Sequence, residues 1–82
     1  SYDRFIEVKA TTSSSPVFYW SENERKVAEK LGDRYFIYIW TNWGKSEQSE
    51  DPMIIKNPYE EIVQKPYEHV HVIETWRVMW ND

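Results

Sequence analysis

Hydrophobic and polar residues alternate over positions 4–10, which is the pattern of a β-strand with two different faces. Ile6 and Val8 fall on one face of this predicted strand, and Glu7 and Lys9 fall on the other. We expect the two aliphatic side chains to pack against the interior. The acid and the lysine then project side by side, with Cα atoms roughly 6.5–7 Å apart given the rise of a strand.

Four later segments also have the composition of strands. Residues 17–20 form a short aromatic run, and we expect them to pair with the first strand in a hairpin-like arrangement. Residues 35–40 are apolar at every position, which indicates a central strand covered on both faces. Residues 53–56 predict a short strand and residues 69–80 a last one. In that last strand Glu74 breaks the alternation and predicts a bulge or an exposed segment.

Two segments carry helix signals. Ser21 and Glu24 are spaced as a capping box, so we predict a helix from there to about Leu31, followed by Gly32 at its C-terminal end. A second, short helix is predicted over 57–64, because an asparagine, a proline and a glutamate occupy its N-cap, first and third positions.

This order of elements predicts an α/β (α+β) fold with a mixed β-sheet flanked by helices. We expect a single domain fragment over 1–82, with a core over 4–64 and a C-terminal strand extension over 67–82. The chain has 82 residues, does not begin with Met and has no apolar run long enough to span a membrane. It therefore predicts a piece of a longer soluble, cytoplasmic protein.

Charge and composition narrow the function classes. The chain has 14 acidic and 10 basic residues, and this net charge of −4 argues against a module that binds nucleic acid through its overall field. It argues less against a nuclease, because acidic metal ligands themselves lower the net charge. Cysteine is absent, which excludes disulfides and thiolate zinc sites. The 5 Trp, 6 Tyr and 3 Phe are more typical of a core or an interface than of base stacking.

Glu7 and Lys9 are the main candidates for chemistry. A carboxylate binds a hard divalent cation, and a neighbouring lysine orients or deprotonates a water and offsets the charge of a phosphate. The alternative is a same-face salt bridge on a solvated sheet, worth under about 1 kcal/mol. For Glu24 the capping box is a sufficient explanation. We expect capping and metal binding to compete, because a carboxylate that reaches back to cap the helix cannot also point at a metal. His69 and His71 share a strand face, but two histidines without a third ligand are weak evidence for a metal site.

The combination of motifs is more specific than any one of them. R-F-I-E-V-K-A-T-T, a proline with an aromatic run, S-x-N-E at a helix start and G-D-R-Y-F-I-Y-I-W follow one another over 4–40. This arrangement resembles the C-terminal domain of the plant protein NO VEIN and its prokaryotic relatives. That family looks like a branch of the PD-(D/E)XK, or restriction-endonuclease-like, superfamily, close to Mrr-type nucleases.

The resemblance implies a site as well as a fold. Glu7 matches the metal-binding acid and Lys9 the catalytic lysine, both on a central strand, and the backbone carbonyl of Val8 is implied as a further metal ligand. Glu24 matches an auxiliary polar position, and Mg²⁺ or Mn²⁺ is the implied cofactor. The superfamily's other metal-binding aspartate precedes this region. Asp3 is the only acid before Glu7 and is expected in a turn, so an N-terminal helix, a first strand and one ligand are expected to be missing.

Two functions remain open from the sequence. The first is a metal-dependent nuclease-like domain that hydrolyses DNA phosphodiesters, in restriction or defence, with the fragment inactive alone. The alternative is a catalytically inactive nucleic-acid-binding or protein-interaction module on the same fold. DNA is the expected partner, and the tryptophans suggest a homodimer or contacts with the missing N-terminal part of the parent protein.

Overall fold

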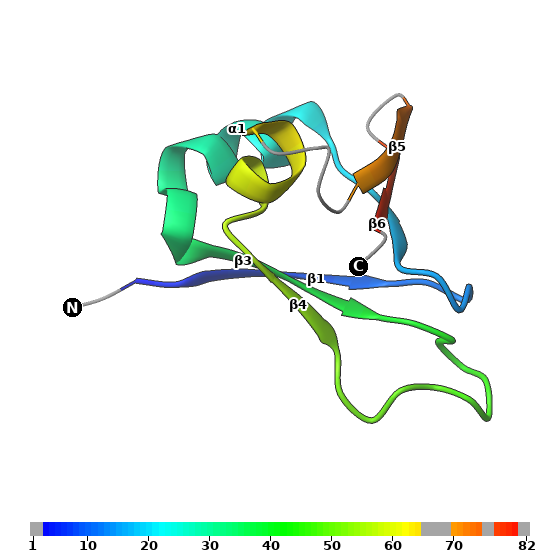
Figure 1. The fold of residues 1–82 in the computed structure, drawn as a ribbon. Coiled ribbons are helices and arrows are strands. Elements are labelled where there is room, and N and C mark those ends of the chain that lie inside the picture. Colours follow the sequence, from blue (N-terminus) through cyan, green and yellow to red (C-terminus); the bar gives the residue numbers. More distant parts are fainter. Residues whose placement is uncertain (1–2, 65–69, 75–76, 81–82) are drawn as a thin grey trace.

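The computed structural model describes residues 3–64, 70–74 and 77–80. Its helices are the α-helix α1, the 3₁₀-helix η1 that continues it, and the π-helix η2. Their bounds are Glu22–Leu31, Gly32–Arg34 and Tyr59–Gln64. The strands β1 to β6 are Phe5–Ala10, Val17–Tyr19, Tyr35–Trp40, Met53–Lys56, Val70–Glu74 and Arg77–Trp80. The strands predicted over 35–40 and 53–56 are confirmed at both ends (Figure 1).

The first sheet contains β1, β3 and β4 in that order. β3 lies in its centre, parallel to β1 and antiparallel to β4, so the sheet is mixed, and the predicted α+β class is confirmed. β1 pairs with β3 from Phe5 opposite Tyr35 to Ala10 opposite Trp40. Within the described residues β1 therefore lies at the edge of its sheet, not in the centre as the resemblance implied.

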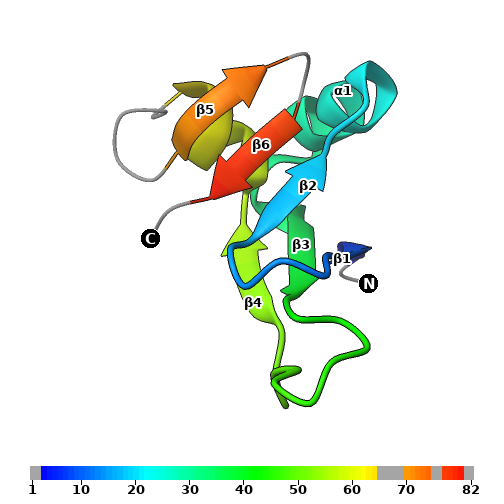
Figure 2. The same ribbon diagram turned by 90° about the vertical axis from the view of Figure 1, so that its right-hand side faces the viewer.

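The second sheet is antiparallel and has the order β2-β6-β5 (Figure 2). The predicted pairing of residues 17–20 with the first strand is wrong, because β2 pairs with β6 instead. The single strand predicted over 69–80 is also wrong. β5 and β6 are antiparallel, and this reversal lets Val78 of β6 pair with Phe18 of β2 in the core. The irregular register lies between Val70 and Val72, not at Glu74.

Local sequence explains the two predicted helices, α1 and η2. The Ser21 hydroxyl accepts from the Glu24 N–H at 3.0 Å and the Glu24 carboxylate accepts from the Ser21 N–H at 2.9 Å, so the capping box is confirmed. Gly32 ends α1 with φ of 58°, a conformation that favours glycine. At the second helix the Asn57 side chain caps the Glu60 N–H at 3.3 Å. The helix predicted over 57–64 is present, with π geometry over 59–64.

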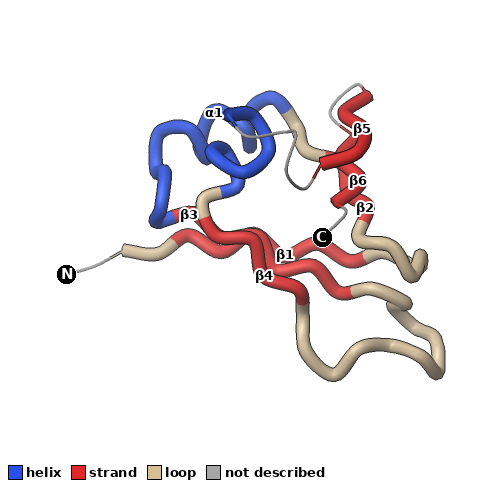
Figure 3. The backbone as a smooth tube through the Cα atoms, viewed as in Figure 1, coloured by secondary structure: helices blue, strands red, loops and turns tan. Residues whose placement is uncertain are grey.

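The core lies between the two sheets and the helices. α1 and η2 cover one side of the sheet formed by β1, β3 and β4 (Figures 1 and 3). Inward-facing residues of β3 and β4 are buried there together with residues of α1, η2 and the second sheet. The buried hydrophobic residues are Phe18, Trp20, Ala28, Tyr35, Ile37, Ile39, Ile55, Ile62 and Val78.

The two faces of β1 are reversed relative to the sequence prediction. Ile6 and Val8 were expected inside, yet they are 42% and 60% exposed. Glu7 and Lys9 face the side that α1 covers, where the partner positions on β3 are the buried Ile37 and Ile39. Alternation fixes which residues share a face, but not which face the helices cover.

Among the described residues no helix has both the length and the apolar character needed to cross a bilayer.

Candidate active site

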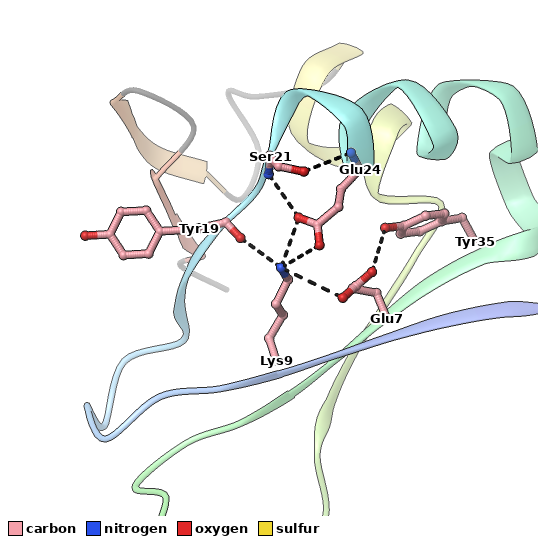
Figure 4. Close-up of polar contacts among 6 residues, drawn as sticks. All are labelled: Glu7, Lys9, Tyr19, Ser21, Glu24 and Tyr35. Atoms are coloured by element: carbon pink, nitrogen blue, oxygen red, sulfur yellow. Dashed lines mark hydrogen bonds and ion pairs between the residues drawn. The ribbon is translucent and has the colours of Figure 1, made fainter.

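Glu7 and Lys9 lie beneath the N-terminus of α1 (Figure 4). The Lys9 ammonium is 4.0 Å from the Glu7 carboxylate, and it donates to both oxygens of Glu24 at 3.1 and 3.2 Å. It also donates to the backbone carbonyl of Tyr19 at 2.9 Å. The Lys9 and Glu7 side chains are only 17% and 23% exposed. The structure thus brings together the three predicted site side chains, two carboxylates on either side of one ammonium.

The capping box positions Glu24 for this contact. The oxygen of Glu24 that accepts from the Ser21 N–H also accepts from Lys9. In a single rotamer the Glu24 carboxylate both caps the helix and contacts Lys9, so capping does not prevent this contact. The expected competition between capping and a metal stays a prediction. The start of α1 and the middle of β1 are fixed to each other by this side chain.

Tyr35 is a site residue that sequence reasoning missed. Its hydroxyl donates to Glu7 at 3.5 Å, a long contact, and its ring is fully buried and stacks on Phe5 with centroids 4.9 Å apart. The Trp20 indole N–H is also buried, and among the described residues it has no hydrogen-bond partner. Tyr35 is the first residue of an apolar run, and only the pairing of Phe5 with Tyr35 in the sheet would have indicated its position beside Glu7.

The carboxyl groups of this site have pKa values that shift in opposite directions. Burial and the neighbouring Glu24 charge raise the pKa of Glu7, although Lys9 partly opposes them. Burial alone would raise the pKa of Glu24, but the Ser21 N–H and Lys9 outweigh it, so this pKa lies below its usual value. Burial raises the pKa of Tyr35 to about 12, and the adjacent Glu7 charge contributes. Opposed shifts in adjacent carboxyls are typical of functional sites and also of structural ion pairs.

The donor set is compatible with a hard cation, but it is small. Magnesium is commonly held by one or two carboxylates, with waters and substrate phosphates completing its shell. Glu7 and Glu24 offer such carboxylates, and the Val8 carbonyl on the same strand stays a prediction. Over residues 3–64, 70–74 and 77–80 no group of three or more metal-ligating side chains occurs. His69 and the side chain of His71 lie outside the described residues, so their exposure stays a prediction.

The geometry defines a class of protein: a small α+β domain that carries an acid and a lysine on one strand and an acid on the helix covering it. Residues 1–55, which include all four of Glu7, Lys9, Glu24 and Tyr35, match the family "Protein NO VEIN, C-terminal". The match covers 55 of the 82 residues, and the chain belongs to this family. No curated protein and no solved structure matches the chain.

Proposed function

We propose that this domain is a metal-dependent nuclease of the PD-(D/E)XK type, close to Mrr-type enzymes, that hydrolyses DNA phosphodiesters in restriction or defence. The convergence of Glu7, Lys9 and Glu24 in one partly buried cluster is the observation that supports this most. A salt bridge on a solvated sheet would leave Glu7 and Lys9 exposed. Here α1 covers both side chains, and Lys9 also donates to the Tyr19 carbonyl and the Glu24 carboxylate.

Each residue has a role in the proposed reaction. Mg²⁺ or Mn²⁺, when bound by Glu7, would supply positive charge that stabilises the phosphate. Lys9 orients the water that attacks phosphorus, and its ammonium offsets charge on the phosphate oxygens. The oxygen of the water bonds to phosphorus as the bond from phosphorus to the leaving oxygen breaks. One water proton stays on the new phosphate hydroxyl, and the other passes through solvent to the leaving oxygen. Glu24 acts as a positioning residue, because it holds the Lys9 ammonium at a fixed place beside Glu7.

The test is a nicking assay on supercoiled DNA with Mg²⁺ or Mn²⁺, carried out on the full-length protein. Glu7→Gln and Lys9→Met should each lower the rate by orders of magnitude, since each removes the charge but keeps most of the side-chain volume. Glu47→Gln and Lys30→Ala are matched controls at exposed positions outside the cluster, and both should cleave like the wild type. Equal rates in all five proteins would remove the assignment.

A second candidate function has its own support. The Lys9 ammonium already has three acceptors within the protein, as in a purely structural ion pair, and the net charge is −4. A catalytically inactive module for nucleic-acid or protein contact would explain both facts. It predicts no metal-dependent activity and no change in the Glu7 carboxyl signal on titration with Mg²⁺. Filter binding of DNA across a salt series would then show whether nucleic acid is a ligand.

A further inference from the structure

A pocket of about 560 Å³ adjoins the candidate active site at Lys9. It lies between the end of β1, the serine-rich loop after it, and β2. Its volume is within the range of about 300–1,000 Å³ that small-molecule sites occupy. Lys9 is shared between this pocket and the carboxylate cluster. A ligand in the pocket would therefore extend directly from a group bound at the cluster.

The pocket wall is rich in hydroxyl groups whose protons are available. Thr11, Ser13 and Ser15 line it. The Thr11 hydroxyl accepts from the Ser13 N–H at 3.2 Å, and the Ser13 hydroxyl accepts from the Ser15 N–H at 3.0 Å. An oxygen that already accepts in this way still has its own O–H to donate. In the part of the chain that the structure describes, neither of these hydroxyls donates to a protein acceptor.

The loop that carries these hydroxyls is tied to the rest of the fold. The Thr11 N–H donates to the Trp40 carbonyl at 2.8 Å, and the Asn42 N–H donates to the Ser13 carbonyl at 2.9 Å. The Trp43 N–H donates to the Thr11 carbonyl, also at 2.9 Å. Three backbone hydrogen bonds therefore hold the backbone of this loop against the end of β3 and the segment after it. Such a wall is organised before a ligand arrives.

Charge and an exposed ring indicate the chemistry of the ligand. Lys9 is the one charged residue of the pocket lining, and no carboxylate lines it. Tyr19 also lines the pocket, and its ring is 70% exposed and extends away from Lys9 (Figure 4). The Lys9 ammonium is already paired with Glu24, so the hydroxyl donors and the exposed aromatic ring carry the argument. Together they suit a phosphate group that is joined to a flat ring. A nucleotide has both parts.

We infer that this pocket binds the nucleotide that adjoins the cleaved bond on one strand of the nucleic acid. Thr11 and Ser13 donate to its phosphate, and the Tyr19 ring stacks on its base. This inference rests on the proposed nuclease function and names a substrate contact for it. Stacking is tolerant of base identity, so the pocket provides affinity and register and not sequence specificity.

The test compares Tyr19→Leu, Tyr19→Phe and Ser13→Ala with the control Ser14→Ala. Ser14 is exposed in the same loop and does not line the pocket. In cleavage of a single-stranded oligonucleotide by the full-length protein, Tyr19→Leu should raise KM roughly tenfold, with kcat about unchanged. Ser14→Ala should match the wild type and Ser13→Ala should also raise KM. Tyr19→Phe, which keeps an aromatic ring, should raise KM less than Tyr19→Leu does. An abasic nucleotide next to the cleaved bond should abolish the difference between Tyr19→Leu and wild type.

Binding of a fluorescent oligonucleotide with Ca²⁺ in place of Mg²⁺ keeps the two proposals separate. If the protein does not cleave but Tyr19→Leu and Ser13→Ala weaken binding, the pocket assignment is supported and the nuclease proposal fails. If the wild type cleaves and these variants bind and cleave like Ser14→Ala, the pocket assignment is wrong and the nuclease proposal stands. A wild type that binds no oligonucleotide overturns the pocket assignment. Circular dichroism of each variant identifies any loss of fold.

Discussion

Glu7 and Glu24 lie on either side of one ammonium, and this arrangement predicts how each titrates. Glu24 should lose its proton below its ordinary pKa of 4.5 and Glu7 above that value. Glu24→Gln should lower the pKa of Glu7, because it removes a neighbouring negative charge and leaves Lys9 to pair with Glu7 alone. Carbon-13 NMR of the side-chain carboxyls measures both values. An unchanged Glu7 titration in the variant would contradict the coupling.

The same shifts set the sign of the pH dependence. A carboxyl with a lowered pKa, such as Glu24, stabilises the fold above its ordinary pKa, and this contribution is lost as the pH falls through the lowered value. Glu7 has the opposite sign: its raised pKa makes its ionisation slightly destabilising at neutral pH. If Glu7 acts as a metal ligand, metal affinity should fall as the pH is lowered through this raised pKa.

Tyr35 predicts a second, alkaline transition. Its pKa is about 12 in the folded protein and 10.0 ordinarily, so its contribution to stability is complete below pH 10 and is lost as the pH rises toward 12. Tyr35→Phe keeps the buried ring and removes the ionising group. Urea unfolding at neutral pH and above pH 10 should show a smaller alkaline loss of stability in the variant than in the wild type. Equal losses would show that another group causes the transition.

Sequence alone indicated that Glu7 and Lys9 share one face of a strand and that Glu24 caps a helix, because strand alternation and capping-box spacing are local properties. Tyr35 and the Tyr19 carbonyl were not identified. They reach Glu7 and Lys9 only through the parallel pairing of β1 with β3 and the path of β2 over the sheet. Neither contact is encoded by spacing along the chain.

At the scale of single elements, the start of α1 connects helix stability to the site. Ser21→Ala removes the hydroxyl that accepts from the Glu24 N–H and should lower the free energy of unfolding by about 1 kcal/mol. Ser14→Ala, in an exposed loop, should change it by less than about 0.5 kcal/mol. Chemical denaturation followed by circular dichroism measures both. If the two substitutions cost the same, the Ser21 cap contributes nothing to stability.

Over residues 3–64 the predicted strands and helices are present, but the predicted pairing of β2 is wrong, for a physical reason. Residues 35–40 and 53–56 are apolar runs between polar loops, so their bounds follow from local composition. β2 was assigned to β1 because a short polar loop separates them. That loop is instead tied to Trp40 and Asn42, so it does not close a hairpin, and β2 continues to the second sheet. Loop length permits a hairpin but does not require one.

At the scale of the whole molecule, the helices cover one face of the first sheet, and no other described element covers the opposite face. Ile6, Val8 and Ile54 lie on that open face and are 42–60% exposed. The sequence predicted a β3 covered on both faces; its inward residues are fully buried, while its outward ones are only partly so. A long apolar run was correct evidence for a central strand, but two-sided burial also depends on which layers the fold supplies.

The two faces of the first sheet should differ in how much a substitution lowers the free energy of unfolding. Val8→Thr should lower the free energy of unfolding by less than about 0.5 kcal/mol, because the Val8 side chain is 60% exposed and loses little burial. Ile37→Ala, on the buried face of the central strand, should cost about 2–5 kcal/mol through lost transfer energy and a cavity. Urea denaturation of the two variants tests this difference. A large cost for Val8→Thr at low protein concentration would mean that Val8 is covered in solution. A cost that grew with concentration would identify a second copy of the chain as what covers it, which is the predicted homodimer.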